Sequence, residues 1–196
     1  MWVVGAIYAG GADTTVSALT TFVLAMVMFP ESQRKAQDEI DRVIGTGRFP
    51  LMTDRQRLPY VEALFKEVLR WHPVAPLGVP HRLTQDDQWQ EYTLPKGSTI
   101  IPNIFAMGHT EDDSNDFKPE RHLDRKAKMH ANEKYYDPRE YVFGFGRRIC
   151  PGKDLADAGV WLGIANLLAA FNFSKKSDGK GGFVDVKDEY TPGIIS

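Results

Sequence analysis

Cysteine is almost absent from this sequence, which has a single one, Cys150, among 196 residues. One cysteine excludes an internal disulfide framework and any zinc site built from several thiolates. No spacing of the HExxH kind occurs among the histidines, which are His72, His81, His109, His122 and His130. If Cys150 binds a metal, that metal must therefore bring most of its other ligands with it.

An excess of positive charge is missing as well. The formal net charge is −2, and no long run of Lys or Arg occurs. We therefore expect no nucleic-acid partner, because binding phosphates requires a basic surface. The hydrophobic share of 42% and the charged share of 26% are ordinary for a globular protein, and the length suits one domain.

Charge is nearly absent from residues 1–29, where Asp13 is the one charged residue. The stretch is long and apolar enough for a transmembrane span. However, Asp13 lies in a small, polar centre, 10–15, and a carboxylate there would be costly in lipid. No Lys or Arg precedes the run, as one would in a signal peptide. We interpret the stretch as a helix that needs neighbours on all sides, with a membrane span as the alternative.

Prolines and glycines divide the rest of the chain into short elements. The predicted helices are 1–29, 30–45, 60–71 and 153–171, with a helical turn capped by Thr53. Residues 92–94 and 98–101 should be short strands around a turn at 95–97, and 179–196 should contain a weak hairpin. Residues 110–139 are predicted to be irregular and exposed. The sequence thus predicts a mainly α fold with a minor β-sheet.

The segment from Phe143 to Gly152 carries the strongest signal. Its glycines allow the backbone to approach a flat group closely. A helix that starts directly after Cys150 would favour a thiolate over a thiol. The alternative is a buried structural cysteine on a glycine-rich turn, which is common for an isolated cysteine.

This segment meets every fixed position of Phe-x-x-Gly-x-Arg-x-Cys-x-Gly, the haem-ligand signature of cytochromes P-450. The chain thus resembles the C-terminal, haem-binding half of that fold. The resemblance implies a haem whose axial iron ligand is Cys150 and whose propionates pair with Arg148 and with His81, for which Arg82 is a competitor. The residues expected against the haem are Phe143, Gly144, Gly146 and Gly152.

Glu67 and Arg70 resemble the Glu-x-x-Arg pair of the family, and Arg121 resembles the third member of its buried structural network. Their spacing places Glu67 and Arg70 on one helical face, so the alternative is a solvated surface pair. His122 stands where the family usually has Phe. We expect this replacement to disturb the region that positions Arg121.

Residues 10–15 resemble the oxygen-activation segment of the family's central helix. The hydroxyl of Thr14 can bond the carbonyl four residues back, and Asp13 and Thr14 are the expected proton donors to dioxygen. The alternative is simple packing of a helix rich in small residues. Substrate contacts are expected at Ala75, Leu77, Val79 and Ile194, whose apolar side chains imply a small lipophilic substrate.

The resemblance implies a monooxygenase that inserts one oxygen atom of dioxygen into its substrate, with electrons from an NADPH–cytochrome reductase. The chain resembles fungal microsomal members of the family, such as those labelled O-methylsterigmatocystin oxidoreductase. Full-length members lie on the cytoplasmic face of the endoplasmic reticulum membrane. We expect 1–196 to be a partial domain, from the central helix to the C-terminal hairpin, without the N-terminal half or an anchor, and therefore intracellular, with the cytoplasm as one location.

Loss of that half should leave apolar surface exposed and the haem poorly enclosed. The alternative function is accordingly a truncated, catalytically inactive remnant that still binds haem.

Overall fold

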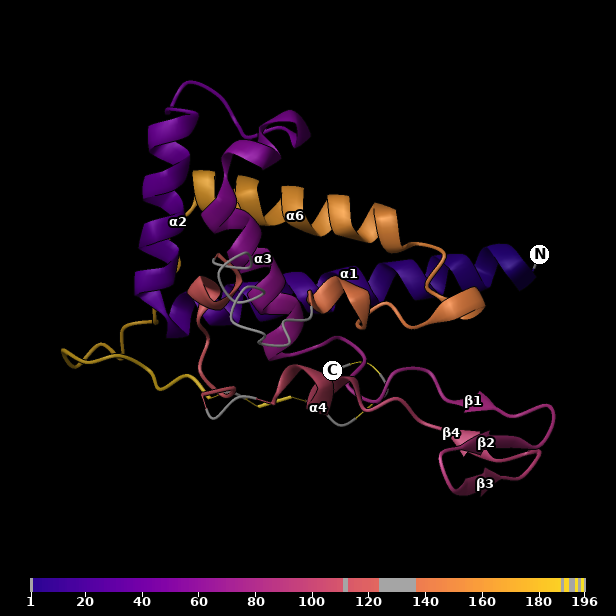
Figure 1. The fold of residues 1–196 in the computed structure, drawn as a ribbon. Helices are drawn as coiled ribbons and strands as arrows, with labels where there is room; N and C mark the ends of the chain where they lie inside the picture. The colour runs from indigo at the N-terminus through magenta and orange to yellow at the C-terminus, as the bar shows by residue number, and fades with distance from the viewer. Residues whose placement is uncertain are drawn as a thin grey trace.

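The computed structural model describes residues 2–110, 113–123, 137–187, 189, 190, 193 and 195. The chain is mainly helical with two small antiparallel sheets (Figure 1), as predicted. The α-helices are α1 (Trp2–Met28), α2 (Pro30–Val43), α3 (Pro59–Trp71), α4 (Ile104–Gly108) and α6 (Lys153–Ala170). The 3-10 helices are η1 (Met52–Arg57), η2 (Pro119–His122), η3 (Pro138–Glu140) and η4 (Gly146–Arg148).

Prolines set the helix starts as expected. Pro30 and Pro59 occupy the first turns of α2 and α3, where a missing backbone N–H costs nothing. The cap of the turn at η1 differs from the prediction. Thr53 lies inside η1, and the carboxylate of Asp54 accepts the N–H of Leu51 at 2.9 Å instead.

The core lies where α1, α2, α3 and α6 meet, with α1 and α6 running side by side (Figure 1). Large side chains from three of these helices are completely buried there, namely Phe22, Met26, Phe65, Trp161 and Ile164. The first half of α1 lies outside this core, and its exposed apolar side chains include Val3, Val4 and Tyr8. The expected exposure of apolar surface is thus confirmed. Among the described residues, one helical stretch, Val3–Met28, is long and apolar enough to cross a membrane by length and composition.

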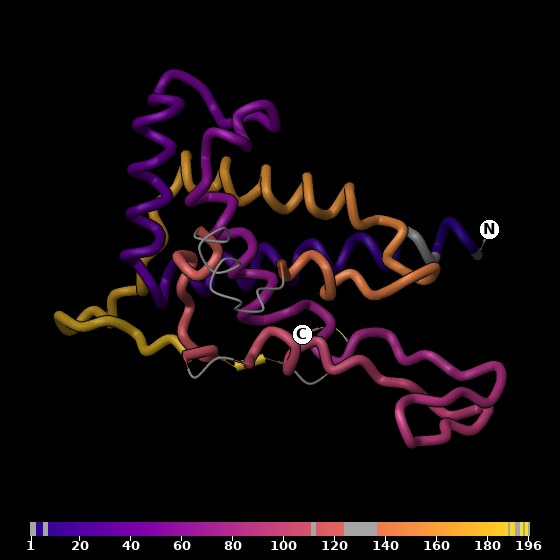
Figure 2. The backbone as a smooth tube through the Cα atoms, viewed as in Figure 1, coloured from indigo at the N-terminus to yellow at the C-terminus, as the bar shows by residue number. Residues whose placement is uncertain are grey.

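The strands form a small lobe beside the helices (Figure 2). They are β1 (His81–Arg82), β2 (Asp87–Trp89), β3 (Tyr92–Leu94) and β4 (Thr99–Ile100). The two expected strands exist, but they do not pair with each other across the turn at 95–97. Instead β4 pairs with β1 and β3 pairs with β2, so one hairpin is nested inside the other pair. In the tail, an isolated bridge joins Ser177 and Phe183, slightly before the position expected for a hairpin.

Candidate active site

Cys150 lies at the end of a tight loop that starts at Phe143. The N–H of Cys150 donates to the carbonyl oxygen of Phe143 at 2.8 Å and closes this loop. Gly144 and Gly146 have φ angles of +80° and +57°, a conformation that side-chain-bearing residues rarely adopt. The loop therefore depends on glycine, and it leaves the thiol of Cys150 exposed.

Helix α6 starts directly after this loop. The N–H of Lys153 donates to the carbonyl oxygen of Cys150 at 3.2 Å. Gly152 is the N-cap of α6, and a Cβ built on it would lie 3.9 Å from the sulfur of Cys150. The sulfur thus lies beside a helix start, where backbone N–H groups lack intrahelical partners.

A cavity of about 680 Å³ opens beside Cys150. Its lining comes from α1, α3 and α6, from the segments 74–81 and 102–104, and from the loop that carries Cys150. Most of the walls are apolar, with Ala18, Phe65, Leu69, Val142 and Val160 among them. Its size and character are those of a site for a small molecule or a cofactor.

Part of the cavity wall belongs to α1. Thr14 and Thr15 both line it, and their hydroxyl groups donate to the carbonyl oxygens of Gly10 and Gly11 at 2.7 and 3.0 Å. Asp13 is exposed and is not part of the lining. Successive helical residues point about 100° apart, so the structure brings Thr14, and not Asp13, to the cavity.

Three basic side chains are part of the lining. Arg147 and Arg148 of η4 lie there together with His81 of β1. Arg82, the alternative to His81, is not part of the lining. Its guanidinium lies 3.4 Å from a Cβ built on Gly97, in the turn at 95–97. The site can therefore receive a ligand whose anionic groups pair with Arg147 and Arg148.

The segment after α3 supplies an apolar wall. Ala75 and Val79 line the cavity, whereas Leu77 is 54% exposed and lies outside the lining. Gly78 packs so tightly that a Cβ on it would lie 2.6 Å from Pro102. Ile194, the remaining expected substrate contact, falls outside the described residues.

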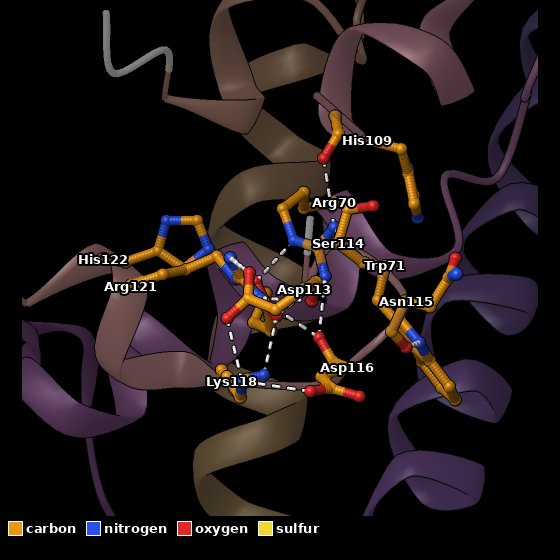
Figure 3. Close-up of polar contacts among 12 residues, drawn as sticks. Arg70, Trp71, His109, Asp113, Ser114, Asn115, Asp116, Lys118, Arg121 and His122 are labelled. Carbon is orange, nitrogen blue, oxygen red and sulfur yellow. Dashed lines mark hydrogen bonds and ion pairs between the residues drawn. The ribbon is translucent and has the colours of Figure 1, made fainter. Parts of the chain in front are cut away.

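Outside the cavity lining, a buried polar network surrounds Glu67, and its members Arg70, Arg121 and His122 are labelled in Figure 3. Arg70 donates to both carboxylate oxygens of Glu67 at 2.8 Å, and Nε of Arg121 lies 3.0 Å from Oε1. Arg70 also donates to backbone carbonyls of Gly108 and Ser114 at 3.0 and 2.8 Å. Glu67 and Arg70 are 0% and 5% exposed. The alternative, a solvent-exposed ion pair on the surface of the helix, is therefore excluded.

His122 takes part in this network. Its Nε2 lies 2.8 Å from Oε2 of Glu67, and the residue is buried. Arg121 keeps its contact with Glu67, so the expected disturbance by His122 was wrong. Burial opposes ionisation of Glu67, but hydrogen bonds from His122 and Arg70 outweigh it and lower its pKa to about 2. Burial also lowers the pKa of His122, so a neutral imidazole donates to the carboxylate.

Sequence reasoning missed the place of Arg147 in the cavity lining and the partner of His122. Arg147 adjoins the signature arginine, so its position beside Arg148 was an available signal. For His122 the signal was a polar residue where the resembling family has an apolar one. Its partner could not be found, because Glu67 is far away in the sequence.

Known proteins match most of the chain. The family model described as Cytochrome P-450 matches residues 1–186. The cytochrome P-450 monooxygenase claR of Ampulloclitocybe clavipes is 48% identical over 198 residues, which cover 100% of this chain and 36% of that relative. The cytochrome P-450 monooxygenase 208 of Postia placenta is 52% identical over 194 residues, covering 97% of this chain and 37% of that relative. The chain thus spans slightly more than a third of these relatives.

Solved structures agree with this match. A zebra fish cytochrome P-450 with progesterone has a TM-score of 0.76 and 31% identity, over 87% of this chain and 38% of that one. A second zebra fish cytochrome P-450 structure, with abiraterone, has a TM-score of 0.77 and 30% identity, over 89% of this chain and 40% of that one. The arrangement of helices around the cavity is therefore shared with these proteins.

Proposed function

Because the chain belongs to the cytochrome P-450 family, we propose that it forms the haem-binding part of a monooxygenase. The proposed reaction inserts one oxygen atom of dioxygen into a small lipophilic compound. One observation carries the proposal: the exposed thiol of Cys150 lines a mainly apolar cavity that Thr14 of α1 also lines. Since the chain spans 36% of a curated relative, we propose that residues 1–196 are part of a larger domain.

The proposed cofactor is haem, whose iron the thiolate of Cys150 would bind. Phe143 and Gly144 would lie against the ring, and Arg148 and His81 would pair with its propionates. In support, a Cβ built on Gly146 meets nothing within 4 Å, so a flat group has room beside the loop. When bound, the haem would supply the redox chemistry that activates dioxygen.

Thr14 is the proposed proton-handling residue. Its hydroxyl proton is held by the carbonyl oxygen of Gly10 at 2.7 Å, which leaves the oxygen free to accept a hydrogen bond from a ligand in the cavity. Asp13, exposed on the neighbouring face of α1, is the proposed proton source. A proton that it delivers from solvent to the Thr14 oxygen would let Thr14 release its own hydroxyl proton to the cavity, so that Thr14 stays neutral.

We propose a lipophilic substrate because Ala75 and Val79 line the cavity beside other apolar groups. Electrons would come from an NADPH–cytochrome reductase, the type of partner that the family generally uses. The proposed location of the full-length protein is the cytoplasmic face of the endoplasmic reticulum membrane.

The test is to express residues 1–196 with added haem and to record the absorption spectrum of the reduced, carbon-monoxide-bound form. We expect a Soret band typical of thiolate ligation in the wild type and in the control Ile149→Val. Cys150→Ser should lose that band. A folded wild-type chain without a thiolate band would overturn the proposed role of Cys150, and haem binding without oxidation of any lipophilic compound when a reductase is supplied would overturn the proposed activity of this chain.

A further inference from the structure

A second ionic cluster lies at the base of the loop that carries Cys150. It holds as many positive as negative groups, namely Arg55 of η1, Glu62 and Lys66 of α3, Asp137 and Arg139 at η3, and Asp157 of α6. None of these residues lines the cavity. The cluster is thus separate from the site described above.

Arg55 and Arg139 bridge the same two carboxylates. Arg55 pairs with Asp157 and reaches Glu62 at 2.7 Å through Nε. Nη1 of Arg139 lies 3.1 Å from Glu62 and 3.6 Å from Asp157. We call these residues, Arg55, Glu62, Arg139 and Asp157, the base clamp.

Further contacts tie the base clamp to the core. Arg139 also reaches Asp137 at 2.7 Å, and Lys66 of α3 holds Asp137 at 2.9 Å. The guanidinium carbon of Arg55 lies 5.3 Å and 5.4 Å from the ring centres of Phe65 and Trp161.

The burial of the base clamp makes its ion pairs stronger than ordinary surface pairs. Side chains of the base clamp are 16% to 28% exposed. Exposed single pairs contribute little to stability, whereas a half-buried network, in which each carboxylate has two cationic partners, is less screened by solvent. Loss of one member would leave its partners desolvated and underpaired.

The position of the base clamp in the sequence gives it a role in the site. Arg139 precedes Cys150 and Asp157 follows it, so their contact closes the whole Cys150 loop at its two ends. Within that loop, the hydrogen bond from Cys150 to Phe143 makes a second, inner closure. We propose that Arg139 and Asp157 are positioning residues, which, held by Arg55 and Glu62, fix the sulfur of Cys150 at the cavity wall. This inference rests on the proposed function, in which that sulfur binds iron.

The first test needs no haem. Hydrogen exchange of the peptide 141–153 is measured by mass spectrometry in the wild type, in Asp157→Asn and in Arg139→Gln. The matched control is Asp154→Asn, an equal charge change on the same helix, nearer to Cys150 and outside the base clamp. We expect exchange to be about tenfold faster in the first two variants and unchanged in the control. Equal exchange in all chains would overturn the proposal.

The second test uses the haem-loaded chains. The thiolate band of the carbon-monoxide complex and the helical circular dichroism are followed together in increasing urea. A positioning role predicts that Asp157→Asn loses the thiolate band before its helices, whereas the wild type and Asp154→Asn lose both together. If Asp157→Asn instead loses both signals together, the base clamp contributes only to stability and the proposed positioning role is wrong.

Two further outcomes separate this inference from the proposed function. If even the wild type shows no thiolate band while exchange still differs between Asp157→Asn and its control, the proposed function fails and the loop closure stands. If Asp157→Asn does not fold, Arg55→Lys replaces it, because Lys keeps the charge but loses the two-armed contact with Glu62 and Asp157. Arg55→Lys should then show a smaller rise in exchange, and no rise would overturn the proposal.

Discussion

The side chain of His122 shows how a single residue sets the acid sensitivity of the Glu67 network. A buried, neutral imidazole donates one of the hydrogen bonds that keep the Glu67 carboxylate ionised. Because burial lowers the pKa of His122 below the ordinary value of 6.5, the unfolded chain binds a proton at a higher pH than the folded chain does. Stability must therefore fall as the pH drops below that value.

We expect His122→Phe to flatten this dependence. Without the imidazole, the free energy of unfolding should change less between about pH 7 and about pH 5. At neutral pH the variant should be less stable by about 1–3 kcal/mol, because Glu67 loses a donor. Urea unfolding at a series of pH values measures both effects, with the exposed His81→Phe as control. Equal pH slopes in the wild type and in His122→Phe would contradict the account.

Gly108 makes a second test at this scale, because its carbonyl holds Arg70. A Cβ on Gly108 would lie 2.9 Å from the hydroxyl of Tyr141 and 3.1 Å from Cγ of Arg70. Gly108→Ala should therefore lower the free energy of unfolding by about 1–3 kcal/mol. Gly47→Ala, whose Cβ meets nothing within 4 Å, should leave it nearly unchanged. Thermal melts of both variants measure this difference. Similar melting temperatures would show that the side chains around Gly108 move and accommodate the added methyl group.

Between elements, Glu39 of α2 caps the start of α3. Its buried carboxylate accepts the N–H groups of Tyr60 and Val61 at 2.9 to 3.0 Å. These N–H groups have no partner within the helix, and a negative charge is favourable at a helix start. The contact thus joins α2 to α3, which carries Glu67 and Arg70.

We expect Glu39→Ala to lower the free energy of unfolding by about 1–3 kcal/mol, since two buried donors lose their acceptor. Glu39→Gln keeps an acceptor oxygen and should lose less. On the same helix, the exposed Asp38→Ala should change stability by no more than about 0.5 kcal/mol. Urea unfolding followed by circular dichroism ranks the variants, and an equal loss in Glu39→Ala and Asp38→Ala would exclude the cap.

Local sequence signals predicted the elements better than their pairing. Pro30 and Pro59 placed two helix starts because proline acts through its own backbone. The partners of β3 and β4 were not predictable, because strand pairing depends on contacts remote in sequence and the turn at 95–97 fits more than one arrangement. The signature around Cys150 is local in the sequence, so it indicated the position of the cavity. The base clamp and the partner of His122 depend on contacts between residues far apart in the sequence, so only the structure shows them.

At the scale of the whole molecule, the first half of α1 exposes apolar side chains. Val3, Val4 and Tyr8 are 71% to 77% exposed, and Val16, just past the middle of the helix, is 63% exposed. Exposed apolar side chains that lie close together on one helix can bind apolar ligands or other chains. The first half of α1 lies beyond the core formed by the second half, so it contributes little to the stability of the chain.

We expect the isolated chain to bind an apolar-surface dye and to self-associate. The triple variant Val4→Ser, Tyr8→Ser and Val16→Ser should reduce both without lowering the free energy of unfolding by more than about 1 kcal/mol. Phe183→Ser removes a single exposed aromatic from the tail and serves as the control. Dye fluorescence and light scattering at increasing concentration measure the effect. A monomeric wild-type chain that binds no dye would contradict this expectation.

Heat and salt should differ in how strongly they weaken the base clamp. The cost of removing charged groups from water falls as temperature rises. We therefore expect warming to weaken the ion pair between Arg139 and Asp157 only slightly. Added salt screens the partly exposed members of the network. The loop that carries Cys150 is therefore expected to tolerate warming at low ionic strength and to loosen in concentrated salt at a temperature where the helical core is unaffected.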